Sequence, residues 1–198
     1  MNLERYTGGT VATNGYLLED GGTTLLIDAP EGIFEWLEQK DLYPDHLLLT
    51  HQHFDHVEDA SRFNCPIHAF APFSRELTLD EQARAWGLPV SVGEFEVTEV
   101  LEGKRELTLG QFKFDLLHVP GHSPDSVVYS LPAHGLALSG DTIFNHGSGR
   151  TDLPGGDGPT LFDGIRTKLL TLPDETQLYP GHGPRTTPAA ERARFPLA

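Results

Sequence analysis

Short apolar runs separated by turn residues recur along the whole chain, and they show two periodicities. Apolar or alternating runs predict strands, at residues 16–18, 24–27, 46–50, 67–70, 112–117, 127–131, 136–138 and 177–179. Apolar residues three or four apart predict helices, at residues 33–40, 57–62, 79–86 and 160–172. This order predicts an α+β fold of 198 residues in a single domain, with β-rich halves at about 1–105 and 106–198.

Composition and charge disfavour proteins that bind nucleic acids or membranes. The net charge is −15, from 14 basic and 29 acidic residues, and the basic residues form no cluster. Nucleic acids and anionic membranes attract basic faces, so we expect neither as a partner. No apolar run approaches the roughly 20 residues that span a bilayer, and the start of the chain lacks the pattern of a signal peptide. We therefore expect a cytoplasmic protein.

Several single side chains carry expectations about burial. Cys65 is the only cysteine, which excludes an internal disulfide and predicts a buried, inert thiol. His46 and His134 stand in turn-like contexts and are expected at the surface. His68 lies in a predicted strand and Trp86 ends a predicted helix, so we expect both to pack in the core.

The densest group of reactive side chains is Thr50-His51-Gln52-His53-Phe54-Asp55-His56, directly after a predicted buried strand. His51 and His53 alternate, so extended backbone points both in the same direction. Asp55 and His56 follow where the chain turns, and they can face a second position beside the first. Three histidines and an aspartate at the end of a buried strand predict a metal-binding motif.

Three later segments each place a polar side chain directly after a predicted strand, beside glycine, which allows close backbone approach. The side chains are His122 in Val119-Pro120-Gly121-His122-Ser123, Asp141 in Ser139-Gly140-Asp141-Thr142, and His182 in Tyr179-Pro180-Gly181-His182-Gly183. With the first motif they complete a set of imidazole and carboxylate ligands. Such ligands suit Zn²⁺, and also iron or Mn²⁺, so we expect two divalent metal ions, with zinc as the first choice.

These motifs resemble a known family. The run His51–His56 resembles the HxHxDH signature of the metallo-β-lactamase superfamily, and the later three segments match its further motifs in order, over about residues 10–195. The resemblance implies a four-layer αββα sandwich with a metal site at one edge. It also implies a first metal held by His51, His53 and His122, a second held by Asp55, His56 and His182, and Asp141 bridging the two.

A narrower resemblance concerns residues 149–157, Gly149-Arg150-Thr151-Asp152-Leu153-Pro154-Gly155-Gly156-Asp157, together with 180–187. These segments look like the small bacterial glyoxalase II-like group. The group implies hydrolysis of glutathione thioesters, such as S-lactoylglutathione, by a hydroxide that bridges the metals. The chain departs from glyoxalase II in lacking its additional C-terminal helical region. Further departures are Arg150 and Asp152 in place of a lysine and a tyrosine, and Glu58 and Asp125 in place of glycines.

Some side chains are expected to act beside the metals. Asp55 and Asp141 can accept a proton during turnover in addition to binding metal. Asp28, at the end of a strand, is expected either to orient a ligand or to cap the turn. His118 is expected to be structural or to support a ligand.

Two further residues are candidates for substrate binding. His146 lies in the loop after Asp141 and is placed to meet substrate. Arg150 is either a clamp for a substrate carboxylate or the ion-pair partner of Asp152, and we favour the ion pair.

Three other functions fit parts of the pattern. Persulfide dioxygenases resemble this chain in a Gly-Arg-Thr-Asp stretch, and they use one iron at positions matching His51, His122 and Asp141. A purely structural metal module is a second alternative, although structural zinc sites are closed and often contain cysteine. A nuclease is a third, and the negative charge disfavours it.

Overall fold

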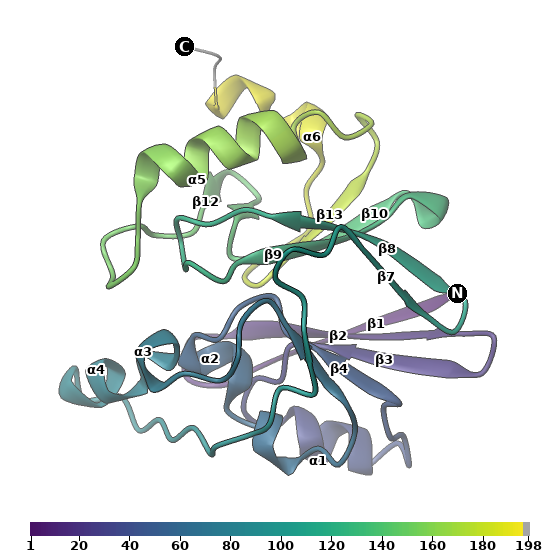
Figure 1. The fold of residues 1–198 in the computed structure, drawn as a ribbon, viewed down its shortest axis with the longest axis vertical. Helices are drawn as coiled ribbons and strands as arrows, with labels where there is room; N and C mark the ends of the chain where they lie inside the picture. The colour runs from purple at the N-terminus through teal and green to yellow at the C-terminus, as the bar shows by residue number, and fades with distance from the viewer. Residues whose placement is uncertain (196–198) are drawn as a thin grey trace. The chain divides into compact units, whose positions relative to one another are not determined.

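The computed structural model describes residues 1–195, which form two compact units (Figure 1). Unit 1 comprises residues 1–102 and 109–111, and unit 2 comprises 103–108 and the chain from residue 112 onward. Each unit has its own β-sheet and its own helices. The α+β class predicted from the apolar pattern is confirmed.

Unit 1 is built on a six-stranded sheet in chain order: β1 (Asn2–Gly8), β2 (Thr13–Asp20), β3 (Thr23–Ile27), β4 (His46–Leu48), β5 (Ile67–Ala69) and β6 (Glu99–Val100). The first three strands are antiparallel, and β3 to β6 run parallel. The hairpin between β2 and β3 turns at Gly21 and Gly22, which both have positive φ. Parallel strands place the polar segment after β4 at one edge of the sheet.

The helices of unit 1 are short: α1 (Ile33–Glu38), α2 (Phe54–Val57), α3 (Arg75–Thr78), α4 (Asp80–Ala85) and a 3₁₀ turn, η1 (Ala60–Arg62). Ile33 and Leu37 of α1 and Val57 of α2 pack into one apolar core with Leu26 and Leu47 of the sheet. The helix predicted over 57–62 is shifted in the structure. Helix α2 begins earlier, at Phe54, and contains the end of the histidine motif.

Unit 2 is built on a five-stranded sheet in the order β13-β10-β9-β8-β7. The strands are β7 (Glu106–Leu109), β8 (Phe112–His118), β9 (Val127–Leu131), β10 (Leu136–Gly140) and β13 (Gln177–Pro180). The β10–β13 pair is parallel, whereas β8, β9 and β10 are antiparallel neighbours. A small ribbon, β11 (Ile143–Phe144) and β12 (Gly147–Ser148), follows β10.

Helix α5 (Gly158–Gly164) continues as a π-helical segment, η3 (Ile165–Leu169), and lies along one face of the unit 2 sheet (Figure 1). Leu161, Ile165 and Leu169 contact Val128 and Leu178 in the core. The remaining helical segments are η2 (Pro132–His134), α6 (Pro188–Glu191) and η4 (Arg192–Arg194). Of the helices that the structure describes, none has the length and apolarity needed to cross a membrane.

Two expectations about single side chains were wrong. Trp86 is 51% exposed rather than core, because α4 ends at Ala85 and the chain turns away at Gly87, whose φ is +85°. His46 is half-buried rather than at the surface, and its Nδ1 lies 3.0 Å from Nε2 of His68. The parallel pairing of β4 with β5 brings these two histidines together. His68 is buried, as expected, and also pairs with Glu99 at 2.8 Å.

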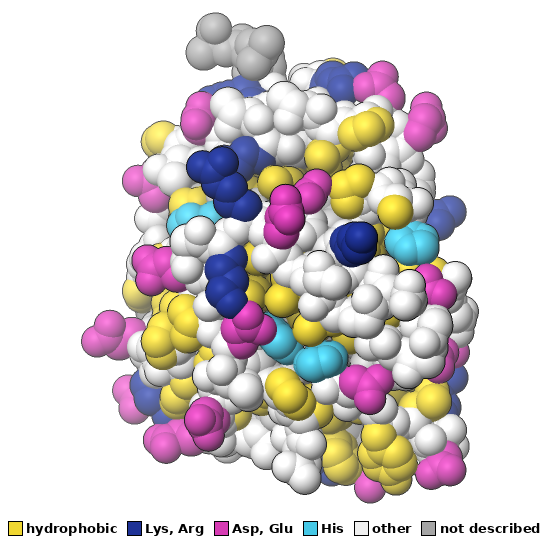
Figure 2. Space-filling view, turned by 45° about the vertical axis from the view of Figure 1, so that its right-hand side comes forward, with side chains coloured by type: hydrophobic (Ala, Val, Ile, Leu, Met, Phe, Trp, Pro, Cys, Tyr) yellow, Lys and Arg dark blue, Asp and Glu magenta, His cyan; other side chains and the backbone are white. Residues whose placement is uncertain are grey.

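The exposed surface mixes charges of both signs. On the face drawn in Figure 2, lysine and arginine side chains are scattered among acidic ones. This distribution agrees with the absence of a basic cluster in the sequence.

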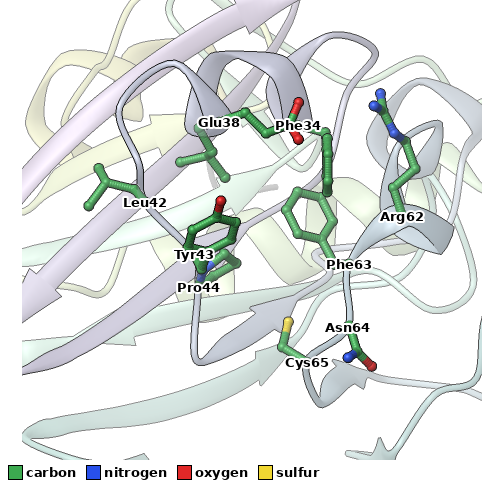
Figure 3. Close-up of a pocket in the computed structure, with 10 residues that line it drawn as sticks. Phe34, Glu38, Leu42, Tyr43, Pro44, Arg62, Phe63, Asn64 and Cys65 are labelled. Atoms are coloured by element: carbon green, nitrogen blue, oxygen red, sulfur yellow. The ribbon is translucent and has the colours of Figure 1, made fainter.

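Cys65 lies in unit 1, away from the histidine motif along the chain. It lines a cavity of about 320 Å³ together with the rings of Phe34, Tyr43 and Phe63 (Figure 3). The thiol is partly rather than fully buried. Its burial raises the pKa to about 11, which keeps the sulfur as an unreactive thiol at neutral pH.

Candidate metal centre

The four predicted ligands of unit 1 directly follow β4 and lie together. The chain is non-helical through His51 and His53 and then enters α2, which carries Asp55 and His56. All four side chains are buried. The His51 ring centroid lies 4.6 Å from that of His53 and 4.1 Å from that of His56, and His56 Nε2 lies 3.4 Å from Asp55 Oδ2. Unit 1 thus gathers three imidazoles and one carboxylate in one place.

Asp28, which follows β3, holds this group of ligands in position. Its Oδ1 accepts a hydrogen bond of 2.7 Å from the Thr50 backbone N–H, and its Oδ2 lies 2.7 Å from Thr50 Oγ1 and 2.8 Å from His56 Nδ1. Donation from Nδ1 to a carboxylate leaves the Nε2 lone pair of His56 available for a metal. The φ of Asp28 is +60°, a conformation that non-glycine residues adopt rarely and mostly at functional sites.

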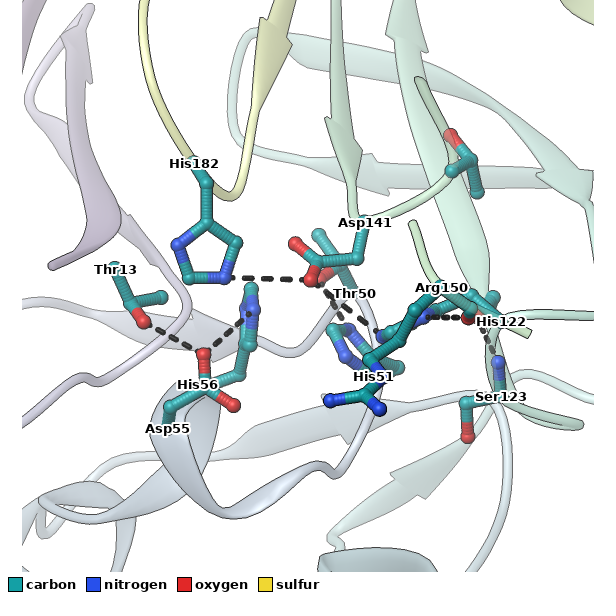
Figure 4. Close-up of polar contacts among 12 residues, drawn as sticks. Thr13, Thr50, His51, Asp55, His56, His122, Ser123, Asp141, Arg150 and His182 are labelled. Carbon is teal, nitrogen blue, oxygen red and sulfur yellow. Dashed lines mark hydrogen bonds and ion pairs between the residues drawn. The ribbon is translucent and has the colours of Figure 1, made fainter. Parts of the chain in front are cut away.

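Two polar residues that could not be predicted from the sequence hold a ligand or the segment that carries the ligands. Thr13, at the start of β2, is fully buried and donates from Oγ1 to Asp55 Oδ2 at 2.6 Å (Figure 4). Gln52 donates from Nε2 to the carbonyls of Ala71 and Pro72 and accepts from the Ser74 N–H, each at 3.1 Å. A threonine in a strand and a glutamine in a loop carry no local pattern that predicts such contacts.

The three predicted ligands of unit 2 also lie together. Asp141 follows β10 and His182 follows β13, and these parallel neighbours end at the same edge of their sheet. Asp141 Oδ2 lies 3.5 Å from His122 Nε2 and 3.3 Å from His182 Nε2 (Figure 4). One carboxylate oxygen therefore stands between two imidazoles, which is the arrangement a bridging ligand requires.

His122 is fixed through its other ring nitrogen. Its Nδ1 lies 2.8 Å from the backbone carbonyl of Arg150, to which it donates. The absence of a side chain at Gly149 makes this approach possible, since a Cβ there would lie 2.8 Å from His122 Nδ1. The glycine in this segment is therefore required by packing against a ligand.

The spacing of the ligand atoms within each unit fits bound metal. Two ligand atoms that are each 2.0–2.2 Å from a tetrahedral ion lie about 3.4 Å apart. The Asp55–His56, His122–Asp141 and His182–Asp141 contacts measure 3.4, 3.5 and 3.3 Å. The His and Asp clusters are thus suited in chemistry and in spacing to a centre for two metal ions.

Arg150 and Asp152, expected as a clamp or an ion pair, form a bidentate ion pair with two contacts of 2.7 Å. The hydrogen bond from Arg150 lowers the pKa of the exposed Asp152 to about 2. His146 lies at the exposed tip of the β11–β12 ribbon with a φ of +69°, and its Nδ1 lies 2.6 Å from Arg194 Nη2. His118 contacts the Pro124 carbonyl through Nε2 at 2.8 Å, so it braces the loop that carries His122.

Glu58 caps the C-terminal end of α2, directly beyond the ligand motif. Burial, followed by the negative charges of Glu31, Asp55 and Asp59, raises the pKa of this carboxyl to about 7. Glu58, which stands where glyoxalase II usually has a glycine, is thus a partly buried carboxyl among other acidic side chains.

Comparison with known proteins places these motifs in a family. A profile of the metallo-beta-lactamase superfamily matches residues 8–182. A Bacillus subtilis protein named as a probable metallo-hydrolase, YqgX, is 35% identical over 207 residues, covering 100% of this chain and 97% of its own. Hydroxyacylglutathione hydrolase GloC of Haemophilus influenzae is 36% identical over 208 residues, covering 100% and 98%.

Solved structures agree with this placement. The BLEG-1 B3 metallo-beta-lactamase superposes with a TM-score of 0.85 at 33% identity, covering 98% of each chain. TTHA1623, crystallised in a di-iron-bound form, superposes with a TM-score of 0.82 at 36% identity, covering 97% of this chain and 98% of its own. The resemblance inferred from the motifs is confirmed, and the chain belongs to the metallo-β-lactamase superfamily of metal-dependent hydrolases.

Proposed function

We propose that this chain is a thioester hydrolase that acts on glutathione-type thioesters such as S-lactoylglutathione. The observation that carries the proposal is the position of Asp141 Oδ2 between His122 Nε2 and His182 Nε2. An aspartate in that position is what the motifs of the glyoxalase II branch imply. The full-length similarity to the hydroxyacylglutathione hydrolase GloC supports the substrate class.

The proposed ligand assignment follows the family motifs. His51, His53 and His122 hold one ion, and Asp55, His56 and His182 hold the other, with Asp141 shared between them. When bound, two divalent ions would supply Lewis acidity that lowers the pKa of a water from 15.7 to about 7 and stabilises negative charge on the substrate carbonyl oxygen. Zinc is our first choice, and the imidazole and carboxylate ligands also accept iron or manganese.

Hydrogen bonds within the chain determine which nitrogen of two ligand imidazoles is available to a metal. Asp28 and the Arg150 carbonyl each accept from an Nδ1–H, so His56 and His122 present neutral Nε2 atoms. The carboxylate of Asp55 or that of Asp141 would accept a proton during turnover, in addition to its main role as a metal ligand. A thiol with a pKa near 8.5 leaves readily as a thiolate, so no separate general acid is required.

A small, uncharged or anionic thioester fits the rest of the molecule. The net charge of −15 disfavours nucleic acid and anionic lipid as substrates. Bound cations locally reverse this negative field, so an anionic small molecule can still enter. We accordingly propose a small-molecule partner and a cytoplasmic site of action.

The test is hydrolysis of S-lactoylglutathione by the purified, metal-loaded protein and by two histidine variants. His53→Ala removes a buried proposed ligand, and we expect turnover to fall at least 100-fold because a coordination position is lost. His134→Ala changes an exposed histidine in η2, and we expect turnover within about twofold of the unchanged protein.

Assays with other substrates distinguish the proposed thioester hydrolase from its alternatives. Hydrolysis of S-lactoylglutathione that depends on His53 supports the proposal. Oxygen uptake on glutathione persulfide, without thioester hydrolysis, would instead identify a dioxygenase that uses His51, His122 and Asp141. Hydrolysis of a β-lactam in preference to the thioester would instead identify a β-lactamase, which is what BLEG-1 is named as.

A further inference from the structure

Glu191 is a buried acidic side chain that the metal motifs do not include. It lies in α6, nine positions beyond His182, and its exposed fraction is 0%. Its Oε1 accepts a 2.6 Å hydrogen bond from Thr186 Oγ1 and a 3.1 Å hydrogen bond from the His146 backbone N–H. Burying a carboxylate costs free energy unless hydrogen bonds or an opposite charge compensate it. These two hydrogen bonds supply part of that compensation.

The two groups that donate to Glu191 belong to two loops, and each loop carries one predicted ligand. The Asp141 loop, residues 141–149, contains the β11–β12 ribbon and is closed by the Gly149 N–H donating to the Asp141 carbonyl at 3.1 Å. The His182 loop, residues 180–186, is closed by an antiparallel bridge between Leu178 and Thr186. His146 belongs to the Asp141 loop, and Thr186 belongs to the His182 loop. Glu191 Oε1 therefore joins the two loops through a single atom.

The other side-chain contacts that join the same two loops are weaker than those of Glu191. The Asn145 side chain donates to the Arg185 carbonyl at 3.2 Å, and the Phe144 ring lies edge-on to the His182 ring at 5.8 Å. The former is exposed, and the latter is an aromatic contact without a fixed hydrogen bond. The two bonds to Glu191 are the ones that involve a fully buried, charged acceptor, which makes them the stronger constraint.

The charge of Glu191 is also compensated. Arg194 Nε lies 3.3 Å from Glu191 Oε2, and Arg194 Nη2 lies 2.6 Å from His146 Nδ1. Arg194 is itself half-exposed, so it stays solvated while it pairs with the carboxylate. The segment 186–194 thus closes a small network of hydrogen bonds around the tip of the β11–β12 ribbon.

We infer that Glu191 is a positioning residue of the metal centre, which holds the Asp141 loop against the His182 loop. In this way it keeps Asp141 Oδ2 and His182 Nε2 at the 3.3 Å spacing that ligands of one ion need. The inference rests on the proposed two-metal function. It assigns to the C-terminal segment a role in retaining the ion that Asp141 and His182 share.

The test is a chelator challenge of the metal-loaded protein, with the metal that remains per chain measured by elemental analysis. Glu191→Ala removes both hydrogen bonds, and we expect one equivalent per chain, that of the ion His182 binds, to be lost at a 10- to 100-fold lower chelator concentration. We expect the other equivalent to change by less than about threefold. Glu191→Gln keeps an acceptor oxygen and is expected to restore most of the retention. Glu175→Ala, an exposed acidic position in the same unit, is the matched control.

Thermal melting of the same samples separates positioning from folding. If Glu191→Ala does not fold, Thr186→Val removes one of the two donors with little change in size, and we expect the same selective loss to a smaller degree. Equal loss of both equivalents, or retention like that of the unchanged protein in every variant, would overturn the inference. An unchanged protein that holds two ions but hydrolyses no thioester contradicts the proposed substrate alone, and one that holds a single ion contradicts the two-metal centre.

Discussion

At the scale of single residues, the proposed metal centre depends on the side chains that hold the ligands as well as on the ligands themselves. Asp28 accepts hydrogen bonds from Thr50 and His56 and adopts a strained backbone conformation to do so. The sequence left two roles open for Asp28, orienting a ligand or capping a turn. Its carboxylate contacts the His56 ring and the backbone N–H of Thr50, which lies 22 residues further along the chain, so these contacts hold the ligand segment rather than cap a local turn.

Asp28→Asn is the sharpest test of this role. An amide nitrogen in place of one oxygen cannot accept from His56 Nδ1, so the ring loses its partner and its preferred tautomer. We expect metal affinity or turnover to fall 10- to 100-fold, and the free energy of unfolding to fall by about 1–3 kcal/mol. Metal retention and urea unfolding measure the two effects. Asp163→Asn, at an exposed position of α5, serves as the control, and equal behaviour of the two variants would contradict the role of Asp28.

Cys65 gives a prediction of pH dependence at the same scale. Because burial raises its pKa to about 11, its thiolate fraction at pH 8 is about 0.001, against roughly 0.2 for a thiol with a pKa of 8.5. We expect alkylation by iodoacetamide at pH 8 to be about 200-fold slower than for a small free thiol, and to rise about tenfold per pH unit. Mass spectrometry of timed samples measures the rate. Labelling at the rate of a free thiol would show that the sulfur is not shielded.

At the scale of elements, most strands could be predicted because their apolar runs are buried on at least one face. Strand β1 was not predicted, because its half-exposed edge position allows the polar sequence Asn2-Leu3-Glu4-Arg5-Tyr6-Thr7-Gly8. Helix α2 was placed too late along the chain. Its buried residues include Asp55 and His56, and polar side chains buried for metal binding conceal the apolar spacing by which helices are recognised.

Helix α4 offers a test in which the sign of a pH effect is defined. Burial of Asp80 raises its pKa, but hydrogen bonds from Thr78 and Arg84 outweigh it and lower the pKa below 3.8. A depressed pKa stabilises the fold above the unfolded value, and this stability is lost as the pH falls through the folded value. We expect Asp80→Asn to lower the free energy of unfolding by about 1–2 kcal/mol at pH 7.

The effect of the same substitution is expected to shrink as the pH falls below the usual range of an aspartate and through the lowered pKa of Asp80, where the carboxyl of the unchanged protein takes up its proton. Urea unfolding of both proteins, repeated at decreasing pH, checks this. A destabilisation that does not change with pH would mean that packing, rather than charge, accounts for the contribution of Asp80.

At the scale of the whole molecule, the family could be predicted because the candidate ligand residues form short motifs with fixed spacing. Thr13, Gln52 and Glu191 could not, since each acts through a partner that lies 19 or more residues away or in another loop. Contacts of that kind arise from tertiary packing and leave no local pattern. The net charge of −15 is a property of the entire chain, and it is the reason why we propose a small molecule rather than a nucleic acid as the substrate.

The central claim is that this chain holds two metal ions through histidine and aspartate side chains. Elemental analysis of protein purified without added metal tests it most directly. We expect about two equivalents per chain, as zinc or as zinc with iron, because the His and Asp clusters are suited to a two-metal site. One equivalent of iron per chain, with oxygen uptake on glutathione persulfide, would contradict it.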